Sequence, residues 1–456
     1  MFFRKRHIDI ANGPLLSNML LFALPIMAMN ILQLMFNAAD MIVVGRFSGK
    51  TALAAVGATG SLINLLVNLF MGLSVGTSVI VSQDYGAGRH VDVSRAVHTS
   101  MTLSIIGGLA VMVTGIVFCK PLLEMMGTPM DIISLSILYM KIYFLGIPGT
   151  MVYNFGSAVL RAIGDSRRPT YYLFMAGVVN VILNLVFVIG FRMGVAGVAW
   201  ATTISQYLSA VLVVICLYRS HGSIRFIPKQ MKISKEKFLP ILRVGVPAGL
   251  QGALFSISNV MVQSAVNSFG STMVAGNSAA VNVEGFVSTS MNAYYNAAIT
   301  FTGQNMGARK YDRIDKIALI CILLIMSTWF VIGGATLLFG RQLLSLYSTD
   351  AQVIELGMRR LFIMMSFYFL CGIMVVFPGI TRAMGYSILP MLVTLVCACL
   401  LRIVWLATIF TWNPTPLMLY ACYPVTWALA GLGQAAIFLF GRRQVRKQNA
   451  PEMEFA

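Results

Sequence analysis

Two stretches of nine residues, one in each half of the chain, decide the fold. The first is Arg161-Ala-Ile-Gly-Asp-Ser-Arg-Arg-Pro169, and the second is Arg382-Ala-Met-Gly-Tyr-Ser-Ile-Leu-Pro390, a shift of 221 in the numbering. Two further pairs share that shift: Gln83-Asp-Tyr-Gly-Ala87 with Gln304-Asn-Met-Gly-Ala308, and Lys120-Pro-Leu-Leu123 with Arg341-Gln-Leu-Leu344. Pro25 and Pro247 match at a shift of 222. Three matches at one constant shift indicate a duplicated unit.

The sequence around these stretches is apolar enough to predict a membrane protein. Of its 456 residues, 58% are hydrophobic and only 11% are charged, against roughly a quarter charged in soluble domains. A membrane helix needs about 20 mainly apolar residues. Twelve such spans are predicted, at 16–44, 53–83, 97–119, 131–160, 170–191, 194–218, 239–267, 274–305, 317–340, 352–381, 387–411 and 415–440. Each repeat therefore holds six spans, an even number, so the repeats are parallel.

The basic residues predict the orientation. A net charge of +18 would suggest nucleic acid in a soluble protein, but these residues lie between the apolar spans, so no nucleic-acid partner is expected. The chain has 33 Lys and Arg residues. The segments expected on one side of the membrane hold 24 of them: the N-terminus, 86–95, 161–168, 219–243, 309–316, Arg382 and the C-terminus. The segments expected on the other side hold five. Both termini are therefore expected in the cytoplasm. The bacterial inner membrane is the expected location.

Three segments follow from this pattern. Residues 1–219 are expected to form a six-helix lobe, 220–238 a cytoplasmic linker and 239–456 a second six-helix lobe. The fold class is thus an all-α membrane protein with two parallel-repeat lobes. The apolar stretch from Leu15 to Val44 is too long for a signal peptide, so we interpret it as a retained first helix.

Sequence motifs for catalysis are not found. Gly45-Arg-Phe-Ser-Gly-Lys-Thr51 resembles a P-loop but has three residues between its glycines, where four are needed. There is no HExxH, nucleophile elbow or dinucleotide fingerprint, and the seven cysteines form no CxxC pair. The sequence therefore predicts neither an enzyme nor a bound cofactor or structural metal, and any work that this chain does would have to draw its energy from an ion gradient.

Two carboxylates, Asp40 and Glu284, lie well inside apolar spans. A charged side chain at the bilayer centre costs from ~3 to over 10 kcal/mol, depending on the estimate. Such a residue needs a pairing partner or a function. A desolvated carboxylate is suited to exchanging a proton or binding a cation.

Polar stripes accompany both carboxylates. Four spans carry polar residues at helical spacing: Asn30, Gln33, Asn37 and Asp40; Ser61, Asn64 and Asn68; Ser256, Asn259, Gln263 and Asn267; and Glu284, Ser288, Asn292 and Asn296. These faces predict a shared watery cavity, the alternative being hydrogen bonds between helices. The candidate substrate-cavity residues are Gln33, Asn37, Asn64, Asn68, Gln263, Glu284, Ser288 and Asn292. We expect Glu284 to attract organic cations, unless it forms a salt bridge to a neighbouring helix.

The fifth and sixth spans supply candidate partners for Asp40. Asn180 and Asn184 share one helix face, and Thr202 follows on the next span. One carboxylate, two amides and a hydroxyl form an all-oxygen site for Na⁺ or a proton relay, although two such amides taken alone are more often packing residues. Arg359 and Arg360 are expected to reach the outer interface, whereas Arg402 lies deeper.

The sequence resembles the multidrug and toxic compound extrusion (MATE) family along nearly its whole length. The matching pieces are both nine-residue stretches above, Asn37-Ala-Ala-Asp-Met-Ile-Val-Val-Gly45, Ala52-Leu-Ala-Ala-Val-Gly57 and Gly86-Ala-Gly88. The resemblance implies a V-shaped molecule of two six-helix lobes that alternates between outward- and inward-facing states. It implies export of organic cations, dyes or antibiotics in exchange for Na⁺ or H⁺, by a monomer within the lipid bilayer.

The resemblance also implies roles for individual residues. The acidic residue of the family's first helix falls on Asp40, and its polar partners fall on Asn180, Asn184 and Thr202. Some members have an acid where this chain has Asn184. The acid that some branches carry on helix 7 is absent, since Phe255 occupies roughly that place, and Glu284 is our proposed substitute.

Other functions remain as alternatives. A flippase for a lipid-linked sugar has a related architecture, but it more often has extra helices and a strongly cationic cavity, whereas here only Arg402 lies deep. An ion channel would be expected to have a symmetric pore, and a membrane enzyme would need a catalytic pair.

Overall fold

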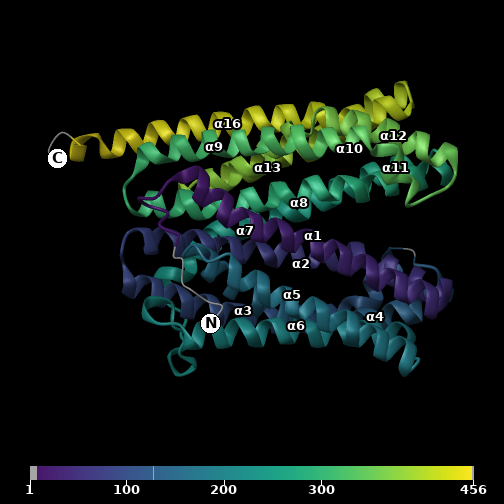
Figure 1. The fold of residues 1–456 in the computed structure, drawn as a ribbon, viewed down its shortest axis with the longest axis horizontal. Helices are drawn as coiled ribbons and strands as arrows, with labels where there is room; N and C mark the ends of the chain where they lie inside the picture. The colour runs from purple at the N-terminus through teal and green to yellow at the C-terminus, as the bar shows by residue number, and fades with distance from the viewer. Residues whose placement is uncertain (1–7, 127, 454–456) are drawn as a thin grey trace. The chain divides into compact units, whose positions relative to one another are not determined.

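The computed structural model describes residues 8–126 and 128–453, without the side chains at 50, 53, 61, 64, 65, 69 and 448–453. All regular secondary structure in these residues is helical (Figure 1). Long helices form because the spans are apolar on nearly all sides, which is typical of helices surrounded by lipid and by one another.

Seven long helices come first along the described chain. They are α1 (Leu15–Phe47), α2 (Gly49–Gly86), α3 (His90–Met125), α4 (Met130–Ala162), α5 (Arg167–Asn184) continued by the π-helix η1 (Leu185–Gly190), α6 (Gly194–Arg219) and α7 (Lys235–Asn267). The short 3₁₀-helices η2 (Gly222–Ile224) and η3 (Pro228–Gln230) precede α7.

The helices after α7 are more often broken. They are α8 (Ser271–Gly307), α9 (Tyr311–Thr328), the π-helix η4 (Trp329–Gly333), α10 (Gly334–Leu338), α11 (Gly340–Ser345), α12 (Ala351–Ser366), α13 (Tyr368–Ala383), α14 (Ile388–Val393), the π-helix η5 (Thr394–Leu400), α15 (Leu401–Trp405), the π-helix η6 (Leu406–Phe410) and α16 (Pro416–Met453).

Ten helices of the described chain are long and apolar enough to cross a membrane, and the pair α12 and α13, bent by 54°, makes an eleventh. The helix α8 is 37 residues long but is not among them. It carries the polar stripe that begins at Glu284, which lowers its hydropathy. Counting α8 gives the twelve spans expected from the sequence.

The chain divides into two compact units. The beginning of the first helix of each repeat belongs to the unit that holds the rest of the other repeat. One unit contains Ala28–Gly249, and the other contains Asp9–Met27 together with Leu250–Ala456. The helix α1 therefore changes unit after Met27, and α7 changes unit after Gly249. The expected lobes 1–219 and 239–456 divide the chain more simply and do not include this exchange. Pro25 and Pro247 lie two residues before the two changeover points.

Glycines allow the first half of α7 to pack against α2 in the first unit. A Cβ atom on Gly72 would collide with the backbone of Gly249, and one on Gly76 would collide with the carbonyl of Ile241. Gly72 and Gly76 lie on one face of α2, as Gly245 and Gly249 do on α7. This small-xxx-small pattern lets two membrane helices approach at backbone distance.

The first half of α1 is held within the second unit. Met19, Phe22 and Ala23 are fully buried, and the ring of Phe22 lies edge-on to that of Phe301 on α8, 5.8 Å between centroids. Arg313 on α9 donates to the carbonyl of Gly13 at 2.6 Å. The chain before α1 is thereby fixed to α9, just as Lys237 at the start of α7 is fixed to Asp84 in the first unit at 2.7 Å.

Candidate ion and substrate sites

A close contact between α1 and α5 positions Asp40. The ring of Phe36 lies against Gly177, where a Cβ atom would collide with the ring. The same ring lies 6.5 Å from that of Phe174. Asp40 is one turn beyond Phe36, and Asn180 is three residues beyond Gly177, so the contact brings the carboxylate opposite the amides.

Both predicted amides reach the carboxylate. The Nδ2 atom of Asn184 donates to Oδ1 of Asp40. The Asn180 amide is assigned by the partners it faces: with nitrogen toward Asp40, it donates to Oδ1 at 3.0 Å and to Oδ2 at 3.3 Å, while its oxygen accepts from the Thr202 backbone N–H at 3.3 Å. In this orientation the Oγ1 atom of Thr202 lies 3.4 Å from the side-chain oxygen of Asn180. The structure thus brings together Asp40, Asn180, Asn184 and Thr202, which we call the Asp40 site.

The site retains one free acceptor. Asn184 has no exposed surface, and its Oδ1 atom has no hydrogen-bond partner within the described chain. A buried amide oxygen without a partner loses the free energy of a hydrogen bond. The Asp40 oxygens are the group that a proton or a small cation would use, whereas Asn184 presents its amide nitrogen, not this oxygen, to Asp40.

A cavity of about 460 Å³ opens onto the Asp40 site. Gln33 and Asn37 line it, together with Asp40, Asn180 and Thr202, and its remaining wall is largely apolar or aromatic. Two other expected cavity residues on α2 are not seen there: the Asn64 side chain lies outside the described part, and Asn68 is not among the lining residues.

Glu284 differs from the expected lone carboxylate, because Arg360 on α12 pairs with it. The Nε and Nη2 atoms of Arg360 donate to the two carboxylate oxygens at 2.8 and 2.9 Å. Its Nη1 atom donates to Asn277 Oδ1 at 2.8 Å. Arg360 is only 5% exposed, so the expectation that it reaches the outer interface is wrong. The salt bridge considered as the alternative for Glu284 is the arrangement found.

The other expected cavity residues of the second unit are dispersed. Gln263 accepts from Asn277 at 3.1 Å and donates to Asn267 at 3.0 Å, so it belongs to the hydrogen-bond network around Arg360. Ser288 is half-buried and Asn292 is exposed. The polar stripe of α8 therefore divides between a buried ion pair and an exposed end, and the bond from Asn277 to Gln263 is of the interhelical kind expected as the alternative to a cavity.

Comparisons with known proteins agree with this architecture. The sequence profile of the MatE family matches residues 25–186 and 247–408. The chain belongs to the MatE family. The two matches begin at Pro25 and at Pro247, the two prolines that the repeat pairs, so each repeat matches the profile separately. The resemblance to multidrug and toxic compound extrusion proteins is thereby confirmed.

Individual MatE relatives align over most of their length. The probable multidrug resistance protein YoeA of Bacillus subtilis (strain 168) is 30% identical over 389 residues, 83% of each chain. The probable multidrug resistance protein YpnP of the same organism is 30% identical over 404 residues, 89% of this chain and 90% of its own. The outward-facing structure of a multidrug resistance MATE transporter superimposes with a TM-score of 0.89, at 22% identity, over 98% of this chain and 99% of its own. The all-helical two-lobe membrane fold is confirmed.

Sequence reasoning missed most of the wall of the cavity at the Asp40 site in the MatE protein, including two tyrosines and a glutamine. Tyr139, Tyr143 and Gln206 line the cavity, and the two tyrosine rings stack 6.0 Å apart. Gln206 could have been found, because it lies one turn after Thr202 on the same face. The tyrosines could not, because an aromatic residue in an apolar helix faces lipid or protein equally well.

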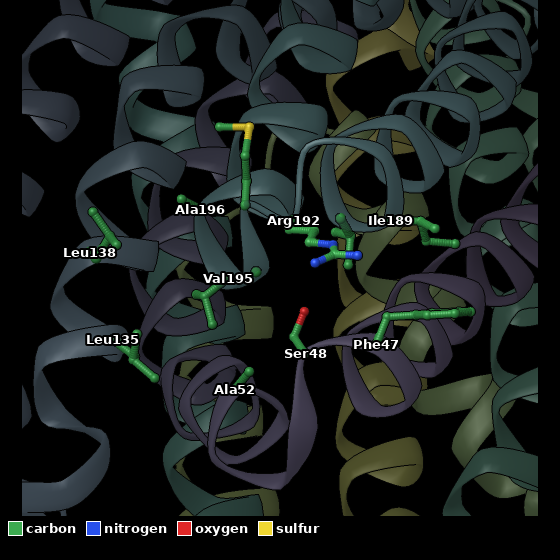
Figure 2. A pocket seen from close by; sticks show the side chains of 12 residues that line it. Phe47, Ser48, Ala52, Leu135, Leu138, Ile189, Arg192, Val195 and Ala196 are labelled. Carbon is green, nitrogen blue, oxygen red and sulfur yellow. The ribbon is translucent and has the colours of Figure 1, made fainter.

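A second pocket in the same MatE lobe lies near the ends of α1 and α6. It measures about 580 Å³ and is largely apolar. Figure 2 shows Ser48 and Arg192 pointing toward its middle, with Leu135 and Val195 on its walls. Arg192 has a positive φ of 54°, which its position in the tight turn between η1 and α6 requires. The lining of this pocket shares no residue with that of the Asp40 cavity among the described residues.

Proposed function

We propose that this MatE transporter is a secondary active antiporter that exports organic cations or drugs in exchange for H⁺ or Na⁺. Membrane embedding and small-molecule cargo follow from the family. The coupling reaction and the direction of transport are our proposal. We also propose that one chain suffices, since all residues of the Asp40 site and of its cavity come from one lobe of the same chain.

One observation supports the proposal most strongly. Asp40 faces a cavity and is held by neutral amides, and no Lys or Arg of the described chain pairs with it. Glu284, by contrast, is neutralised by Arg360. A carboxylate without a cationic side chain next to it attracts a cation from solution. A proton or Na⁺ and a positively charged substrate can therefore compete for one group.

Competition for one carboxylate gives exchange. Binding of the inward-moving ion at Asp40 removes the charge that holds a cationic substrate, so the substrate leaves. Loss of the ion on the other side restores the charge and the affinity for substrate. The aromatic rings of Tyr139 and Tyr143 in the same cavity can hold the apolar and cationic parts of an organic molecule.

The test is dye efflux from proteoliposomes in which an H⁺ gradient and a Na⁺ gradient are imposed separately. We expect one of the two gradients to drive export of a cationic dye, and collapsing that gradient to stop it. A rate of dye efflux that does not change with either gradient would refute antiport. Transbilayer movement of a lipid-linked sugar without dye efflux would favour the flippase alternative.

A further inference from the structure

Arg402 is the most deeply buried cation in the described part of the second unit. It lies on α15 and is 1% exposed. Its Nε atom donates to Thr426 Oγ1 at 3.2 Å. Its Nη1 atom donates to Ser258 Oγ at 3.4 Å and to Asn259 Oδ1 at 3.2 Å. The guanidinium lies 4.4 Å from the ring centroid of Tyr423 and 5.4 Å from that of Phe255. We call Arg402 and these five neighbours the Arg402 centre.

The side chains that hydrogen-bond to this guanidinium or stack on it are neutral, and Arg360 contacts the same Tyr423 ring at 5.5 Å. Within the described chain no carboxylate pairs with Arg402, and its Nη2 atom has no hydrogen-bond acceptor. Arg360, another buried arginine of the same unit, has both a carboxylate and an amide acceptor. A buried charge without a counter-ion is destabilising, because its lost hydration is not replaced. The unpartnered N–H therefore points to an anionic acceptor supplied from outside the chain.

The position of Arg402 in the repeat gives an independent reason to expect a ligand. The shift of 221 pairs Thr202 of the Asp40 site with Tyr423, and the shift of 222 pairs Asn37 of the Asp40 cavity with Asn259. The same span that carries Asn180 in the first repeat carries Arg402 in the second. The two repeats thus build equivalent centres of opposite charge.

The backbone at both centres is irregular in the same way. The π-helix η1 begins directly after Asn184, and α15 is enclosed by the π-helices η5 and η6. A π-helical turn leaves part of the helical hydrogen-bond pattern unfilled and is frequently found at functional sites. Its recurrence at the equivalent span supports a binding role for the Arg402 centre.

We propose that the Arg402 centre binds an anionic oxygen group, either a carboxylate or a phosphate. Arg402 presents its free Nη2 atom as a charge-assisted donor, and the exposed Asn259 marks the side from which a ligand can approach. The rings of Phe255 and Tyr423 favour an anionic group attached to an aromatic solute. This inference goes beyond the proposed cation export and does not depend on the coupling ion or the direction of transport.

Calorimetric titration of the purified full-length protein tests the proposal with three probes. They are 2-naphthoate, its neutral analogue 2-naphthamide, and inorganic phosphate. We expect the wild type to bind 2-naphthoate at least about tenfold more tightly than 2-naphthamide, a ratio equivalent to about 1.4 kcal/mol. Binding of phosphate as well would indicate a site that recognises charge alone, and binding of 2-naphthoate only would indicate a solute site. Equal affinity for both naphthalene compounds, or no binding of either anion, would overturn the proposal.

Variants show whether Arg402 is responsible. Arg402→Gln is expected to remove the preference for the anion. Arg359→Gln is the matched control, because Arg359 is an arginine of the same unit whose side chain is 62% exposed, and the preference should remain. A preference that persists in Arg402→Gln would overturn the assignment.

A second variant keeps the test decisive if Arg402→Gln does not fold. Asn259→Asp places a carboxylate where an amide oxygen now lies 3.2 Å from Nη1. This internal counter-ion should raise the melting temperature and abolish the preference for 2-naphthoate. An Asn259→Asp protein that still prefers 2-naphthoate would contradict an anion site at Arg402.

Discussion

Asp40 and Glu284 are carboxylates of apolar spans whose neighbours differ in charge. The amides of Asn180 and Asn184 hold Asp40 without neutralising it. Arg360 neutralises Glu284 through two hydrogen bonds and is itself placed over the rings of Tyr420 and Tyr423. The sequence predicted the Asp40 site because its residues lie on helix faces that can be inferred from spacing. It left the pairing of Glu284 as an alternative, because spacing places Glu284 on a helix face but does not show that Arg360 of another helix meets it.

Replacing Asp40 should separate coupling from folding. Asp40→Asn keeps the side-chain shape and one acceptor oxygen for the amides but removes the charge. We expect gradient-driven efflux of a cationic dye to be lost, while the melting temperature changes little. Asp131→Asn, an exposed carboxylate at the start of α4, serves as the control and should transport normally. Normal coupled transport by Asp40→Asn would remove Asp40 from the mechanism.

The Glu284 pair should contribute to stability. Removing one partner of a buried ion pair costs about 3–5 kcal/mol, because the other charge is left uncompensated. Glu284→Gln is therefore expected to lower the melting temperature strongly, and adding Arg360→Met should recover part of the loss. The control Glu355→Gln breaks an exposed pair with Arg341, which is worth about 1 kcal/mol or less. A stable Glu284→Gln protein that loses affinity for cationic dyes alone would restore the recognition role predicted from the sequence.

At the scale of helices, small residues decide which spans can meet. The sequence predicted the spans from their hydropathy and the shift between repeats from its motifs. It did not predict that α1 and α7 change unit after Met27 and Gly249. Hydropathy measures how apolar a span is, but not which neighbour it contacts. The glycines of α2 and α7 were informative in retrospect, because both helices carry them four residues apart.

The packing of α7 on α2 is testable at Gly72. Gly72→Leu would force a side chain into the α7 backbone near Gly249. Overpacking of this kind typically costs about 1–3 kcal/mol, so a lower melting temperature or a loss of folded protein is expected. Gly107→Leu on α3 is the matched control, since a Cβ atom there has no neighbour within 4 Å. Equal stability of the two variants would mean that the close helix contact is not required.

At the scale of the whole molecule, the duplication constrains the topology. The family profile matches both halves in the same direction along the chain, and an even number of spans per half gives both halves the same orientation. The shift of 221 pairs the turn at Arg192 with the turn at Asn413. We therefore expect these two turns to lie on one side of the membrane and the segment around Gly222 to lie on the other.

Alkaline phosphatase fusions in a bacterial host test this arrangement, because the enzyme folds into an active form only outside the cytoplasm. The excess of Lys and Arg predicts a cytoplasmic location for Gly222 and for the C-terminus. Phosphatase fused after Arg192 or after Asn413 should therefore be active, and phosphatase fused after Gly222 or at the C-terminus should be inactive. A fluorescent protein, which needs the cytoplasm, should give the opposite pattern at all four positions and controls for poor expression. Opposite results at Arg192 and Asn413 would mean that the repeats are inverted. If the fusions at Arg192 and Asn413 were both inactive and those at Gly222 and the C-terminus were both active, the repeats would still be parallel. Only the cytoplasmic placement of the termini would then be overturned.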